Sequence, residues 1–104
     1  MPAETESSEQ SNSIQLGGNI ELEGFGHVDR DGMVVVKKMV GIAAKRMSDK
    51  DPKFQSLKII LERPGGFNVT AIMKTQDNTN SAQATHGNLY MVLNEVLENV
   101  IGQL

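Results

Sequence analysis

The chain has 104 residues, enough for one domain with a single hydrophobic core. Its content of 38% hydrophobic and 22% charged residues is ordinary for a globular protein, and the absence of cysteine excludes disulfides and thiol chemistry. Three of the 13 acidic residues and none of the ten basic ones lie in residues 1–13, so the net charge of −3 belongs to that segment. A nucleic-acid site must therefore come from local clustering of basic residues.

Residues 1–13 (MPAETESSEQSNS) are rich in Ser and Glu and have no large apolar residue after Met1. They predict a disordered acidic tail before a single domain at residues 14–104. No apolar run approaches the roughly 18 residues of a membrane helix, and the acidic start is unlike a signal peptide. We therefore expect a cytoplasmic protein with no membrane partner.

The first predicted element is a strand over residues 14–23, broken or extended at Gly17-Gly18. Ile20 and Leu22 alternate with acidic residues in the period of a half-buried strand. A glycine- and aspartate-rich turn follows, in which Asp29 or Asp31 could cap the next helix. That helix is predicted over residues 33–48 from one apolar stripe, formed by Met33, Val36, Val40, Ala43, Ala44 and Met47.

Two alternating segments, residues 55–62 and 67–74, flank the tight-turn signal Arg63-Pro-Gly-Gly66 and predict a hairpin. Residues 81–86 predict a short polar strand, and Gly87-Asn88 predicts the cap of a final amphipathic helix reaching Leu104. The order β-α-β-β-β-α predicts a two-layer α+β sandwich, with a four-stranded mixed sheet and two helices on one face. A right-handed crossover makes the first two strands parallel neighbours.

Catalytic and metal-binding patterns are missing from the sequence. His27 and His86 belong to no ligand-spaced cluster, and neither a nucleophile elbow nor a phosphate-binding glycine loop occurs. We therefore expect a protein that is not an enzyme and has no metal or cofactor.

Basic residues concentrate on the first helix and its exit loop, at Lys37, Lys38, Lys45, Arg46, Lys50 and Lys53. Such a face can neutralise phosphates of a nucleic acid, although an ordinary solvated helix face has the same composition. Four aromatic residues in the whole chain are too few for a base-stacking sheet, so RNA would be bound by shape and phosphate contact.

A second apolar patch on the same helix consists of Val35, Met39 and Ile42. It can pack against the final helix or against a neighbouring chain. The outward face of the final helix, with Asn94, Glu95 and Glu98, is acidic or neutral.

The segment Asn88-Leu-Tyr-Met-Val-Leu-Asn94, the ending Gln103-Leu104 and the order of elements are similar to the ribosome hibernation-promoting factor and protein Y family. The final helix of that family typically opens acidic-Met-Tyr-Ala-Ala-Ile-Asp and ends Gln-Leu. The resemblance covers about residues 14–104, and it implies a fold akin to the double-stranded-RNA-binding domain. It further implies a non-enzymatic factor that binds the small ribosomal subunit in the decoding channel and favours an idle ribosome.

Together these observations predict a ribosome-associated, translation-silencing factor whose partner is rRNA of the small subunit, with no DNA partner expected. Its predicted RNA-binding residues are Lys37, Lys38, Lys45, Arg46, Lys50, Lys53, Lys58, Arg63 and Lys74. The alternative is a protein-interaction or homodimerisation module on the same fold, without RNA binding, that uses Val35, Met39 and Ile42.

Overall fold

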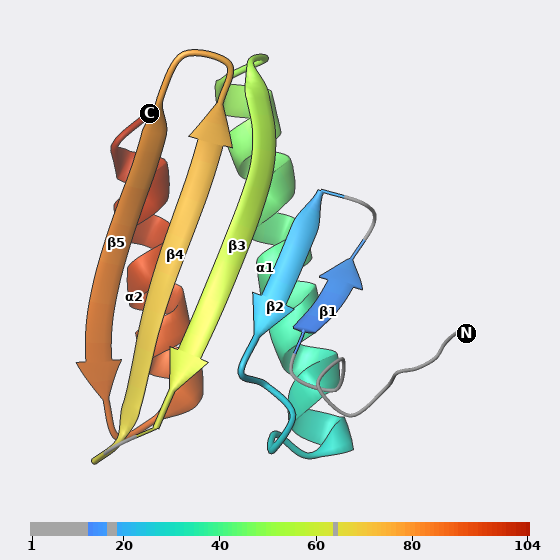
Figure 1. The fold of residues 1–104 in the computed structure, drawn as a ribbon, viewed down its shortest axis with the longest axis vertical. Coiled ribbons are helices and arrows are strands. Elements are labelled where there is room, and N and C mark those ends of the chain that lie inside the picture. Colours follow the sequence, from blue (N-terminus) through green and yellow to red (C-terminus); the bar gives the residue numbers. More distant parts are fainter. Residues whose placement is uncertain (1–12, 17–18, 64) are drawn as a thin grey trace.

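The computed structural model describes residues 13–16, 19–63 and 65–104. The predicted disordered tail lies outside these residues except for Ser13, which begins the first strand. Two helices pack on one face of a five-stranded sheet (Figure 1). The elements in chain order are β1 (Ser13–Leu16), β2 (Ile20–Glu23), α1 (Arg30–Lys50), β3 (Phe54–Glu62), β4 (Phe67–Thr75), β5 (Thr79–His86) and α2 (Leu89–Gly102).

The sheet has the strand order β1-β2-β3-β4-β5. β2 and β3 are parallel and the other neighbours are antiparallel, which confirms the parallel start and the meander predicted from sequence. The segment predicted as one strand is instead the hairpin β1–β2, with Leu16 paired to Ile20, so the sheet has five strands. The sequence contains the reason, because a glycine pair between two short alternating stretches is a turn signal.

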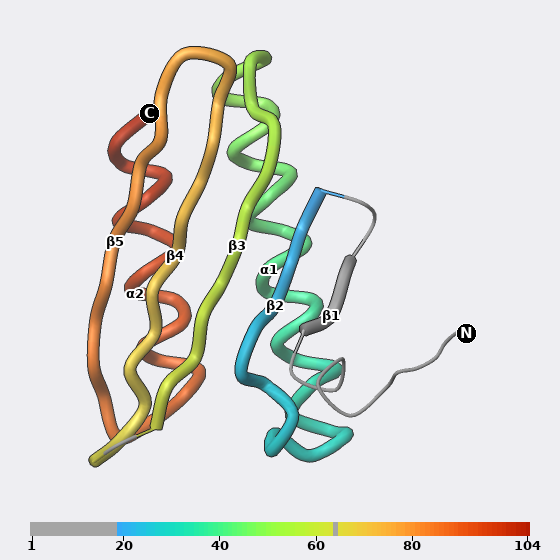
Figure 2. The backbone as a smooth tube through the Cα atoms, viewed as in Figure 1, coloured from blue at the N-terminus to red at the C-terminus, as the bar shows by residue number. Residues whose placement is uncertain are grey.

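Helix α1 connects the parallel strands β2 and β3, and the backbone trace shows it crossing behind the sheet (Figure 2). It begins earlier than predicted because the Oδ1 atom of Asp29 accepts the backbone N–H of Gly32 at 2.7 Å. The predicted stripe is confirmed, since Val36, Val40 and Met47 are fully buried. This burial outweighs the strand preference of the run Val34-Val35-Val36.

Helix α2 lies behind β4 and β5 (Figure 1). The side chain of Asn88 accepts the N–H groups of Tyr90 and Met91, so the predicted cap is confirmed. The core joins both helices to the inner face of the sheet and includes the buried side chains of Leu22, Phe25, Val36, Val40, Met47, Leu57, Ile59, Val69, Met73, Leu93 and Val96.

None of the described helices or strands covers the face of the sheet opposite α1 and α2, which we call the open face. Alternation places Leu57, Ile59 and Leu61 of β3 in the core and turns Lys58 and Ile60 outward. Within the described ranges, no helix has the length and apolar character that crossing a membrane requires.

Candidate nucleic-acid interface

The outward side of α1 carries three exposed lysines of the predicted set. Lys38 and Lys45 are seven residues apart, two turns of helix, and project on the side opposite the buried stripe. Lys37 is also exposed, but it lies beside the buried stripe, about 100° around the helix from Lys38. Among the described residues, neither Lys37 nor Lys38 has a carboxylate within ion-pair distance. Lys45 Nζ lies 3.6 Å from Asp49 Oδ2 in an exposed pair.

Arg46 is directed toward α2 instead of outward. Its Nη1 atom lies 2.6 Å from Glu98 Oε2, and its Nη2 atom lies 3.3 Å from Glu98 Oε1. The hydrogen bond and the positive charge of Arg46 lower the pKa of Glu98, and the same bond raises the pKa of Arg46. Arg46 therefore already holds a carboxylate in the two-pronged geometry in which it would hold a phosphate.

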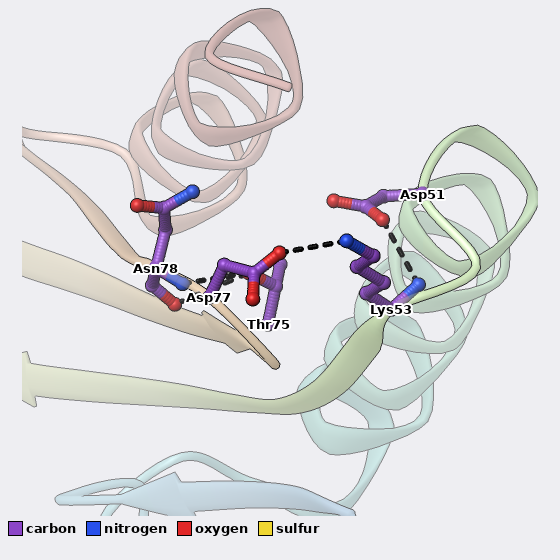
Figure 3. A network of polar contacts seen from close by, with 5 residues as sticks. All are labelled: Asp51, Lys53, Thr75, Asp77 and Asn78. Carbon is purple, nitrogen blue, oxygen red and sulfur yellow. Dashed lines mark hydrogen bonds and ion pairs between the residues drawn. The ribbon is translucent and has the colours of Figure 1, made fainter.

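Lys50 and Lys53 fasten elements together. The Nζ atom of Lys50 donates to the carbonyl of Ile101 at 3.3 Å, at the end of α2 where the helix dipole favours a cation. Lys53 Nζ lies 2.8 Å from Asp77 Oδ2, which joins the start of β3 to the β4–β5 turn (Figure 3). In the same network the backbone N–H of Lys53 donates to Asp51, and the N–H of Asn78 donates to the hydroxyl of Thr75.

The last three predicted cations lie on other surfaces. Lys58 is on the open face of the sheet, 3.1 Å from Glu23, and this hydrogen bond, with the nearby charges of Glu23 and Glu21, raises the pKa of Lys58. Lys74 is exposed on β4 near Lys58, where both border one cavity. Arg63 lies over the ring of Phe67, 5.2 Å from the ring centre. The nine predicted residues therefore do not form one surface, and the structure leaves Lys37, Lys38 and Lys45 as its cationic stripe.

The predicted apolar patch lies at the junction of the helices. Met39 packs against the core, whereas Val35 and Ile42 are 44% and 56% exposed. Met39 and Ile42 border a cavity of about 200 Å³ between α1 and α2, together with Ala43, Arg46, Asn94, Leu97 and Glu98. Sequence reasoning missed three further exposed hydrophobic side chains, Val34, Tyr90 and Met91. The helical period would have revealed Val34, because it lies one turn before Lys38.

His86 contacts a carboxylate at the surface. Nε2 of His86 lies 2.9 Å from Glu95 Oε1, an ordinary surface contact between β5 and α2. Within the part of the chain that the structure describes, no group of three potential metal ligands gathers.

The chain matches no family model, and no curated protein is similar enough to it to count as a match. Function must therefore be argued from the site itself.

Proposed function

We propose that this protein is a ribosome-associated RNA-binding factor of the hibernation type, which neutralises rRNA phosphates of the small subunit with the outward face of α1. The observation that carries the proposal is the stripe of Lys37, Lys38 and Lys45, because all three side chains are exposed and only Lys45 has an ion pair among the described residues, the exposed one with Asp49. A bound position in the decoding channel, implied by the family resemblance, would silence translation by blocking mRNA and tRNA.

The stripe has the reach and freedom that phosphate contact needs. Eight residues separate Lys37 from Lys45, which is about 12 Å of helix and long enough to face several phosphates of one strand. The exposed pair of Lys45 with Asp49 contributes only about 0.3–0.5 kcal/mol, so a phosphate can replace it readily.

The other predicted cations have secondary parts in this proposal. Arg46 reaches RNA only after leaving Glu98, whereas Lys50 and Lys53 hold the fold together. Lys58 and Lys74 lie on the opposite side of the molecule and do not bind the same RNA surface. The absence of basic residues on the outward face of α2 makes α1 the whole of the cationic contact.

The test is co-sedimentation with purified small ribosomal subunits at low and moderate salt. Binding that weakens with salt is expected for the wild type, and Lys38→Glu should remove it because this substitution places a negative charge at the centre of the stripe. Lys74→Glu is the matched control, with the same change of charge on the opposite face. A wild-type protein that stays in the supernatant even at low salt would refute the proposal, and equal losses in both variants would refute the α1 site.

The alternative function is a protein-interaction module, and the exposure of Val35 and Ile42 beside the helical junction favours it. Met39→Asp places a charge in that junction. If this alternative holds, the variant loses its protein partner yet keeps its fold and any RNA affinity, as judged by circular dichroism and subunit co-sedimentation.

A further inference from the structure

Strand β5 is a long sheet edge with little protection from its own residues. It is the outermost strand on its side (Figure 1), and none of its eight residues, TNSAQATH, is Lys, Arg, Asp, Glu or Pro. It pairs with β4 without a break in register. Natural sheets usually protect an exposed edge with charges, proline, a bulge or a very short strand, because free backbone groups recruit further strands. The other edge, β1, has only four residues.

The β4–β5 turn fixes which backbone groups of β5 are free. The N–H of Thr75 donates to the carbonyl of Asn78 at 2.8 Å, so these two residues are a hydrogen-bonded pair. Bonded and non-bonded pairs alternate along an antiparallel ladder. Every second residue of β5 therefore points its N–H and C=O away from β4; these residues are Thr79, Ser81, Gln83 and Thr85.

An independent contact agrees with this alternation. The amide Nε2 of Gln103 donates to the carbonyl of Ser81 at 2.8 Å, from a residue just after α2. The Ser81 carbonyl therefore points away from β4, as the alternation of bonded and non-bonded pairs along the ladder predicts. Gln103 thus occupies one of the free edge groups.

Charge along this edge does not oppose self-association, because β5 itself has no Asp, Glu, Lys or Arg. Glu95 of α2 contacts His86 near the end of β5, and Gln103 contacts Ser81 near its start. A two-fold axis through the middle of β5 brings the start of one strand beside the end of the other. The Glu95 side chains of the two copies then lie at opposite ends of the contact and do not face each other.

We propose that two copies of this protein join through β5, antiparallel and centred on Gln83, to form one continuous sheet across both copies. Gln83 pairs with its counterpart, and Ser81 pairs with Thr85 of the second copy. Because both copies use the same edge, the assembly closes at two. The contact involves few apolar groups, so we expect a weak dimer that forms at high concentration. It is independent of RNA binding, since α1 lies behind β2 and β3, away from this edge.

The first test is sedimentation velocity of the wild type and Gln83→Pro, from micromolar to millimolar concentration. The N–H of Gln83 points away from β4, so proline there removes an edge donor without breaking the β4–β5 ladder. We expect the wild type to dimerise with concentration and Gln83→Pro to stay monomeric with an unchanged circular dichroism spectrum. Gln83→Thr is the control, because it keeps the donor and should still dimerise.

The second test does not depend on proline. Gln83→Lys and Gln83→Glu should each be monomeric alone at low salt, because like charges meet at the two-fold axis, whereas their equimolar mixture should dimerise. Gln103→Ala should raise the dimer fraction by freeing the Ser81 carbonyl. A wild type that stays monomeric throughout would overturn the proposal. So would a dimer that Gln83→Pro leaves intact and Met39→Asp dissociates, because the interface would then lie on the helices.

Discussion

At the scale of single residues, two glycines, one in a loop and one in a helix, have opposite effects on stability. Gly24 follows β2 with φ at +85°, and a Cβ atom there would lie 2.1 Å from the carbonyl oxygen of Leu61. Gly41 lies inside α1, and a Cβ atom there would have no neighbour within 4 Å. The conformation of Gly24 is therefore required by the fold, whereas that of Gly41 is ordinary helix.

Gly24→Ala should destabilise the protein and Gly41→Ala should stabilise it. The first change imposes backbone strain on the order of 1–3 kcal/mol, in addition to the clash with Leu61. The second removes the helix penalty of glycine, a gain of about 0.5–1 kcal/mol. Urea denaturation of both variants measures the free energy of unfolding, and equal effects would show that Gly24 is not constrained.

The pair of Arg46 and Glu98 should make stability depend on pH in the acidic range. Because Arg46 lowers the pKa of Glu98 in the folded state, the pair stabilises the protein above the ordinary carboxyl pKa. This contribution disappears as the pH falls through the lowered value. We expect Glu98→Gln to flatten that part of the stability curve slightly, since both side chains are about half exposed. Denaturation midpoints across acidic pH measure the effect, and Glu62→Gln, at an exposed carboxylate with no ion pair among the described residues, serves as the control.

At the scale of elements, the sequence predicted the helices and strands correctly where the pattern of apolar residues and the capping residues indicate the same element. The stripe of α1, the alternation of β3 and β4, and the cap of α2 were all predictable, because periodicity reports which side chains face the core. The hairpin of β1 and β2 was predicted as one strand, because two short strands on either side of Gly17-Gly18 show the same alternation of apolar and polar residues as one long strand. The partners of Arg46 and Lys53 could not be predicted either, since Glu98 and Asp77 lie on elements far along the chain.

The cap of α2 offers a matched pair of substitutions within one helix. Asn88→Ala should destabilise the protein by about 1 kcal/mol, because the N–H groups of Tyr90 and Met91 lose their acceptor. Asn94→Ala, at an exposed position inside the same helix, should be neutral or slightly stabilising, because alanine is the better helix former. Thermal melts of the two variants would refute the capping role if the melting temperatures fell equally.

At the scale of the whole molecule, the distribution of charge matters more than its sum. Lys37, Lys38 and Lys45 lie exposed on α1, while on the open face of the sheet Lys58 is paired with Glu23. A net charge of −3 therefore does not exclude a local contact with RNA.

The slope of RNA affinity against salt concentration should report how many lysines of the stripe contact phosphates. Three phosphate contacts give a slope of log K against log salt of roughly −2 to −3, at about −0.7 to −0.9 for each contact. Removing one contact, as in Lys38→Ala or Lys45→Ala, should reduce the slope by about one such step. Lys74→Ala should leave the slope unchanged, and a loss there as large as on α1 would show that the RNA also touches the sheet.

The short hairpin β1–β2 has a consequence for how large an assembly can become. It lies against only four residues of β3, from Leu57 to Ile60, and it covers the side of the sheet opposite β5. Without the hairpin, β3 would become a second long sheet edge in addition to β5. Copies could then pair through both edges and form a fibre. The hairpin therefore prevents pairing through the β3 side of the sheet. Although it pairs with only four residues of β3, it limits self-association to a dimer.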